Sequence, residues 1–207
     1  MLTAEELARL GALAHGPDQA MFRSAHVLGR VTVAEMLAVD PHEVDLVQRC
    51  QRCGGPHGVP RTIVGGTPGP HLSLAHADGI VMAATADRPV GIDLEPVGQA
   101  PTTIEPVVLS EAEQAQWSAR PDRDLTRWWV RKEAVLKAAG VGLSVDPREV
   151  EVTPPWEAPR LVRWPAAPAP YVMADVPLPG FVVAVAAAGA EPLEVEVEQG
   201  RWPRLVS

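Results

Sequence analysis

The sequence predicts an α+β protein built from two lobes of similar size. Each half of the 207-residue chain contains segments with helical spacing and a set of short strands of the antiparallel type. A stretch with proline and glycine near residues 96–102 lies between the halves and indicates a connection. We therefore expect an N-terminal lobe over residues 1–98 and a C-terminal lobe over residues 99–207.

The first half has two helical segments followed by three strands. Thr3 and Glu6 form a capping box in front of the first helix, and apolar residues at helical spacing continue both helices. Gly- and Pro-containing turns separate the strands. We expect helices over 3–13 and 21–38, a loop over 51–70, and strands over 72–76, 80–86 and 90–95.

The second half has three helical segments before its strands. Ser110 and Glu113 form a second capping box, and Gly140 is a typical end for the longest helix. Proline-rich connectors separate the strands that follow. We expect helices over 102–109, 110–119 and 122–139, a surface excursion over 154–168, and strands over 149–153, 170–175, 181–187 and 193–197.

The composition is typical of a globular protein and argues against several classes. Hydrophobic residues make up 46% and charged residues 21% of the chain, which disfavours disorder. The net charge of −8 disfavours general nucleic-acid binding. No apolar run is long enough to span a bilayer, and the acidic start of the chain differs from a signal peptide. We expect a cytoplasmic protein with no nucleic-acid or membrane partner.

Two cysteines, Cys50 and Cys53, are followed by His57. A structural zinc site usually has four ligands, and a second cysteine pair is missing. A zinc or redox site is one interpretation. We favour the other, a turn-rich connector with reduced thiols.

Only two lysines occur, Lys132 and Lys137, and they flank Glu133 in a predicted helix. An ammonium is a compact point charge, unlike the planar fork of arginine, so this cluster is a candidate for chemistry. Trp129, Glu133 and Lys137 are four-residue steps and share one helical face. The simpler alternative is a helical ion pair worth ~0.2–0.5 kcal/mol, beside core tryptophans.

Carboxylates from two elements suggest a metal site. Asp93 and Glu95 are two apart in a predicted strand, so their side chains project from the same face. Together with Glu133 they provide the oxygen ligands that Mg²⁺ prefers, alongside water and substrate phosphates.

Basic side chains could neutralise a polyphosphate near these carboxylates. Arg23 and Arg30 are seven apart and share a helical face, which indicates either a solvated surface or a phosphate clamp. Arg61, His76 and the two lysines add further positive groups. The residues alone therefore suggest a metal that bridges a diphosphate, with a carboxylate and an ammonium available for proton transfer.

Two motifs resemble the signature pair of the 4′-phosphopantetheinyl transferases. They are Gly91-Ile92-Asp93-Leu94-Glu95 and, about 35 residues later, Trp129-Val130-Arg131-Lys132-Glu133-Ala134-Val135-Leu136-Lys137. The chain is more similar to the larger, surfactin-synthetase-activating type. Leu72-Ser73-Leu74-Ala75-His76 resembles the family segment that ends in Ser-His, and Gly58-Val59-Pro60 resembles its Gly-Lys-Pro loop. The resemblance covers about residues 20–185.

This resemblance implies a fold and an activity. The fold would be a single-chain pseudo-dimer, two similar α/β lobes related by pseudo-two-fold symmetry with the active site in the cleft between them, and the protein would be a monomer. The activity would be Mg²⁺-dependent transfer of the 4′-phosphopantetheine arm of coenzyme A to a serine of an apo acyl or peptidyl carrier protein, with release of 3′,5′-ADP. Mn²⁺ is an alternative metal, and the carrier would serve polyketide, nonribosomal peptide or fatty acid biosynthesis.

The resemblance also implies roles for individual residues. Asp93, Glu95 and Glu133 would hold the metal, Glu133 would accept the serine proton, and Lys137 would neutralise charge on the leaving oxygen. The residues expected to contact coenzyme A are Arg23, Arg30, Arg61, Ser73, Leu74, Ala75, His76, Asp93, Lys132 and Lys137.

The chain departs from the family pattern at two positions. Val59 stands where the family usually has lysine, so that phosphate contact would either be lost or be taken over by Arg61. Ala75 replaces the serine before His76. Two alternative functions remain open at this point. One is a non-catalytic homologue that binds coenzyme A or a carrier protein, and the other is a metal-dependent nucleotide pyrophosphohydrolase.

Overall fold

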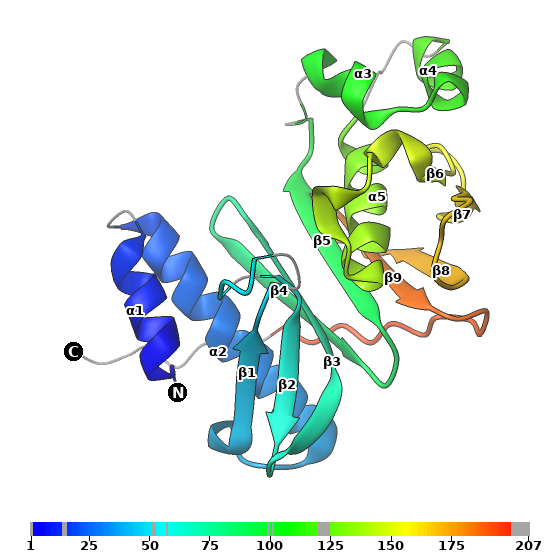
Figure 1. Ribbon diagram of the computed structural model, residues 1–207. Coiled ribbons are helices and arrows are strands. Elements are labelled where there is room, and N and C mark those ends of the chain that lie inside the picture. The colour runs from blue at the N-terminus through cyan, green and yellow to red at the C-terminus, as the bar shows by residue number, and fades with distance from the viewer. Residues whose placement is uncertain are drawn as a thin grey trace.

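The computed structural model describes residues 2–199 except 14–15, 51–52, 57, 99, 101 and 120–124. It confirms an α+β fold, in which two antiparallel sheets lie side by side and each is covered by a long helix (Figure 1). The first sheet contains β1 (Val44–Gln48), β2 (Pro60–Val64), β3 (Thr67–Ala77) and β4 (Ile80–Ala86) in that order. The second has the order β5 (Val90–Pro96), β9 (Phe181–Ala188) and β8 (Tyr171–Asp175), and β6 (Glu151–Val152) pairs with β7 (Leu161–Arg163).

The N-terminal half places α2 (Pro17–Leu37) across the first sheet, with α1 (Ala4–Ala12) against α2 (Figure 1). The core between α2 and the sheet includes Val33, Val44 and Leu72, all nearly inaccessible to solvent. A Cβ added at Gly29 would lie 2.9 Å from the Leu72 side chain, so this glycine allows α2 to approach β3 closely. The 3₁₀ turn Pro41–Glu43 then leads into β1.

The C-terminal half is built around α5 (Thr126–Ala139), which packs on β5 and β9. Trp128, Ala134 and Leu136 of α5 are fully buried in its core. Gly140, with φ of 72°, ends α5 in the left-handed conformation. The remaining elements are α3 (Glu105–Val108), α4 (Glu111–Ser118) and the 3₁₀ turns Thr102–Ile104, Gly142–Ser144 and Pro147–Glu149.

Strand β5 belongs to the second sheet. It pairs with β9 along its whole length, from Val90 opposite Ala187 to Pro96 opposite Phe181. The chain therefore enters the second sheet at residue 90, before the lobe boundary that we expected at residue 98. Asp93 and Glu95 thus lie in the same sheet that supports α5.

Three segments differ from the sequence-based expectation. The predicted loop over 51–70 contains β2 and the start of β3, because the turn at Gly65-Gly66 connects two short strands that pair with each other. The predicted strand over 193–197 is irregular. Its alternation of Glu and Val fits a strand, but both edges of the adjacent β9 are already paired with β5 and β8. The predicted excursion over 154–168 also contains β7.

Within the described residues, no helix has both the length and the apolar character needed to cross a membrane. Cys50 and Cys53 form no disulfide with any residue that the structure describes, and they lie in a turn that the hydrogen bond from Cys50 N to Gly55 O closes at 2.9 Å. His57, the third group of the alternative zinc interpretation, lies outside the described residues.

Candidate active site

The contact between β5 and α5 brings the two signature motifs together. A Cβ added at Gly91 would lie 2.0 Å from the Ala134 carbonyl oxygen and 2.4 Å from the Ala138 nitrogen. Only glycine therefore permits this backbone approach. As a result, the Lys137 ammonium reaches β5, where Nζ donates to Ile92 O at 3.1 Å and to Asp93 Oδ1 at 2.6 Å.

Three carboxylates and Lys137 form one electrostatic cluster. Burial raises the pKa of Asp93, which is 7% exposed, although Lys137 and His76 act in the opposite direction. Burial also raises the pKa of Glu133, and the negative charges of Asp93 and Glu95 raise it further, against the opposing effect of Lys137. Because the carboxylates repel one another, the cluster has more negative charge than a single ammonium balances.

The cluster is chemically suited to a hard divalent cation. Asp93 Oδ2 and Glu133 Oε1 are buried and have no hydrogen-bond partner in the described part of the chain, and buried oxygens of this kind are rarely left unpaired. Among the residues that the structure describes, no three His, Cys, Asp or Glu side chains already surround a common point. The fit to magnesium therefore rests on the oxygen donors and their free lone pairs, with side-chain rotation needed to bring the carboxylates together.

Strand β3 brings His76 to this cluster. His76 is exposed at the end of β3 and lies close enough to Asp93 to influence its pKa. Ala75 is buried against β5, and Leu74 packs near Gly29 of α2. The Ser73 hydroxyl accepts a hydrogen bond from Ile92 N at 3.1 Å. Of the predicted coenzyme A segment, His76 is therefore the side chain presented at the surface.

The loop that resembles the family's Gly-Lys-Pro segment also reaches α5. A Cβ added at Gly140 would lie 3.5 Å from Val59 Cγ2, so the loop contacts α5 one turn beyond Lys137. Arg61 follows on β2 and is exposed. Arg23 is exposed on α2, and within the described part of the chain neither arginine forms an ion pair.

Arg30 was predicted to bind phosphate together with Arg23, but it is buried and paired with Glu6. Its side chain is only 2% exposed, and Nη1 and Nη2 donate to the two Glu6 carboxylate oxygens at 3.0 and 2.8 Å. His26 Nδ1 lies 2.6 Å from Glu6 Oε1. The Arg30 charge is therefore neutralised inside the protein, where it fixes α1 to α2 and is not presented to coenzyme A.

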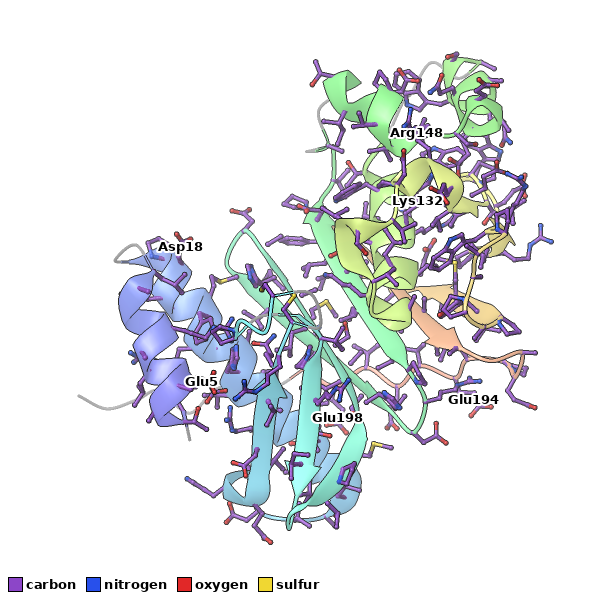
Figure 2. All side chains as sticks on the ribbon, in the orientation of Figure 1. Glu5, Asp18, Lys132, Arg148, Glu194 and Glu198 are labelled. Carbon is purple, nitrogen blue, oxygen red and sulfur yellow. The ribbon has the colours of Figure 1, made fainter. Side chains whose placement is uncertain are left out.

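Lys132 also differs from its predicted contact with coenzyme A. Its side chain has no exposed surface, and Figure 2 shows it on α5 inside the C-terminal half. Nζ donates to Glu113 Oε2 at 2.5 Å, Val108 O at 2.7 Å and Pro147 O at 2.9 Å. All three ammonium protons are thus used within the protein. Lys132 therefore connects α5 to α4 through Glu113 and to the 3₁₀ turn Pro147–Glu149 through Pro147 O.

Two functionally relevant groups were missed by the sequence analysis. Glu113 was predicted only as a helix cap, but it also accepts from Val152 N at 2.9 Å and balances Lys132. No sequence signal pairs these two residues, which are 19 positions apart. The role of Gly91 in packing was also missed, although a glycine inside a strand often marks a close approach of two backbones.

Comparisons with known proteins identify a class for this arrangement. Residues 89–186, the segment from β5 to β9, match the 4′-phosphopantetheinyl transferase superfamily. The chain is 27% identical over 194 residues to the 4′-phosphopantetheinyl transferase psf-1 of Bacillus pumilus, covering 86% of this chain and 78% of that protein. It is 24% identical over 148 residues to a 4′-phosphopantetheinyl transferase of Bacillus subtilis, covering 70% of this chain and 62% of that protein. The resemblance to this superfamily is therefore confirmed.

Solved holo-[acyl-carrier-protein] synthases match about half of this chain at low TM-scores. The enzyme of Thermotoga maritima is 23% identical, with a TM-score of 0.39 over 49% of this chain and 63% of that one. The enzyme of Neisseria meningitidis is 18% identical, with a TM-score of 0.40 over 49% of this chain and 97% of that one. A coenzyme A complex of the Chronobacterium ammoniagenes protein has a TM-score of 0.36 at 18% identity, over 49% and 97%. TM-scores this low do not define the geometry of the present site, which follows from the contacts within this chain.

Proposed function

We propose that this protein transfers the 4′-phosphopantetheine arm of coenzyme A to a serine of an apo acyl or peptidyl carrier protein. The serine oxygen would form a bond to the phosphorus of the arm, the bond from that phosphorus to the bridging oxygen would break, and 3′,5′-ADP would leave. The observation that carries the proposal is the convergence of Asp93, Glu95, Glu133 and Lys137 within the segment that matches the superfamily.

Glu133 is the residue best suited to accept the serine proton. Its pKa is raised by burial and by the charges of Asp93 and Glu95, and a general base works best when its pKa lies near the operating pH. Its buried Oε1 has no hydrogen-bond partner among the residues that the structure describes, so the oxygen is available to a substrate hydroxyl or to a water that relays the proton.

Lys137 is the residue best suited to the leaving group. Its ammonium has three protons, and two are donated to Ile92 O and Asp93 Oδ1. The third can be donated to the bridging oxygen of the diphosphate as negative charge develops there. Magnesium held by Asp93, Glu95 and Glu133 would supply further neutralisation of the diphosphate charge.

We also propose that the two halves are pseudo-symmetric lobes of a monomer that acts in the cytoplasm. The pseudo-symmetry is supported by the arrangement of one long helix, α2 or α5, across one antiparallel sheet in each half (Figure 1). Because β5 carries Asp93 and Glu95 but lies beside β3, a site between the lobes would receive groups from both.

The direct test combines the protein with coenzyme A, Mg²⁺ and an apo carrier protein, followed by intact-mass measurement of the carrier. A mass gain of one phosphopantetheine, together with release of 3′,5′-ADP, is the expected result. An unchanged carrier with intact coenzyme A would favour a non-catalytic binding protein. Cleaved coenzyme A with an unchanged carrier would favour a nucleotide pyrophosphohydrolase.

A further inference from the structure

Ser73 lies on a part of β3 that is buried on both faces. Leu72 and Leu74 approach α2 at Gly29, whereas Ala75 packs in a cluster with residues of β5 and β9. Because side chains alternate along a strand, Ser73 projects to the same side as Ala75. Ser73 is 5% exposed. Its hydroxyl is therefore directed toward β5 and away from solvent.

The backbone N–H and C=O of Ile92 on β5 form hydrogen bonds with side chains that lie outside β9. Ile92 N donates to Ser73 Oγ at 3.1 Å, and Ile92 O accepts from Lys137 Nζ at 3.1 Å. The N–H and C=O of one strand residue point to the same side. Ser73 and Lys137 therefore hold the open edge of β5 from two directions, one from each half of the molecule.

We propose that Ser73 is a positioning residue for Asp93. It acts through the N–H of Ile92, the residue directly before Asp93, and so fixes the Asp93 carboxylate relative to Lys137 and to His76 on the same strand as Ser73. This role rests on the proposed function only in that Asp93 is taken as a metal ligand. It differs from a direct contact between Ser73 and coenzyme A.

The consequence of losing the hydroxyl follows from burial. Without Ser73 Oγ, the Ile92 N–H would be left without its partner at a buried strand edge, which is unfavourable. Relief requires β5 to shift, and such a shift moves Asp93 away from Lys137. Residues that orient metal ligands in this way typically change metal affinity by about 10- to 100-fold when they are removed.

The test measures Mn²⁺ binding to the full-length protein without coenzyme A or carrier, by isothermal calorimetry or electron paramagnetic resonance. We expect Ser73→Ala to weaken Mn²⁺ binding by about tenfold or more, and Ser73→Thr, which keeps a hydroxyl, to restore it. The matched control is Thr62→Val. Thr62 is also buried and its hydroxyl donates to Pro70 O, but β2 is separated from β5 by β3.

The outcomes separate this inference from the proposed function. If wild-type protein binds Mn²⁺ and Ser73→Ala binds it as tightly as Thr62→Val does, the positioning role is wrong. If wild-type protein binds no Mn²⁺, the metal assignment of the proposed function is wrong, and the role of Ser73 with it. Should Ser73→Ala fail to fold, amide exchange in wild-type protein decides. The Ile92 amide should exchange slowly, and exchange as fast as that of an exposed amide would overturn the inference.

Discussion

The two lysines, one directly before Glu133 and one four residues after it, have opposite environments. Lys132 is completely buried; burial lowers its pKa, and the negative charge of Glu113 opposes this effect. Lys137 is partly exposed and reaches Asp93 across the α5–β5 contact. Lys132 therefore stabilises the fold around α5, whereas Lys137 is available to a substrate. Glu133 lies between them in sequence and combines burial with acidic neighbours.

At Glu133, the effects of a substitution on activity and on stability should separate. We expect Glu133→Gln to lower the rate of carrier modification by at least about 100-fold, because the general base is lost. The melting temperature should stay the same or rise, since the pKa of Glu133 is raised and its charge is therefore unfavourable in the folded protein. Mass-based kinetics and thermal unfolding measure the two effects. Glu105→Gln, on α3, is the control and should change neither.

Among the elements, β5 and α5 are brought together by a missing side chain. The Gly91 backbone lies directly against the last turns of α5, at Ala134 and Ala138. This contact positions Asp93 beneath Lys137, one helical turn after Glu133. The separation of β5 from α5 thus determines both the packing of the C-terminal half and the geometry of its charged cluster.

Gly91→Ala should disturb both properties at once. The added methyl group would overlap the Ala134 carbonyl, and overpacking of this kind typically costs about 1–3 kcal/mol. We expect a reduced free energy of unfolding in urea and a loss of carrier modification. Gly11→Ala is the matched control, because an added Cβ there meets no atom within 4 Å. Gly11 lies in the last turn of α1, where the substitution should not destabilise the protein. Equal effects of the two substitutions would contradict the close-contact argument.

The attachment of α1 should depend on pH through Glu6. Burial by itself raises the pKa of Glu6, but hydrogen bonds from His26, Arg30 and the Thr3 N–H outweigh it and lower the pKa from 4.5 to about 2. A carboxyl with a lowered pKa stabilises the folded protein above its unfolded pKa, and this contribution disappears as the pH falls from 4.5 toward 2.

Urea unfolding at pH 7 and pH 3 tests this dependence. We expect Glu6→Gln to reduce the free energy of unfolding at pH 7 by about 3 kcal/mol and to make it less sensitive to acid than in wild-type protein. Glu5→Gln, one residue earlier and exposed, should leave both values unchanged. A Glu6→Gln variant as acid-sensitive as wild type would show that other carboxyls cause the loss.

At the scale of the whole molecule, the two halves share a core. Ala75 of β3 packs with Val90, Ile92 and Leu94 of β5, and side chains of β4 such as Met82 pack against the same cluster. The Ser73–Ile92 hydrogen bond also joins β3 of the first sheet to β5 of the second. Because neither sheet buries this apolar surface alone, the halves should unfold together.

The tryptophan positions allow a simple test of this cooperativity. Five of the six tryptophans lie in the described part of the C-terminal half, at positions 117, 128, 129, 156 and 164. Tryptophan fluorescence therefore reports mainly on that half, whereas far-ultraviolet circular dichroism reports on both. We expect the two signals to give the same transition midpoint in urea. A fluorescence midpoint clearly different from the circular dichroism midpoint would mean that the halves unfold independently.

The sequence by itself determined the fold class, most helices and the residues of the charged cluster. Capping boxes at Thr3 and Ser110 and the terminal Gly140 are local signals, and the structure has α1, α4 and α5 at these places. The alternation in β5 likewise indicated that Asp93 and Glu95 share a face. These features were accessible because their cause lies within a few residues along the chain.

Only the tertiary structure decided which charges are available and which are buried. Arg30 and Lys132 were indistinguishable in sequence from phosphate-binding residues, yet their partners, Glu6 and Glu113, lie 24 and 19 positions away. The strand predicted over 193–197 failed for a similar reason, since a strand forms only where it pairs with another strand, and its own sequence does not provide that partner. Ion pairs and strand pairs form between residues that only folding brings together. They therefore cannot be predicted from the sequence of a single segment.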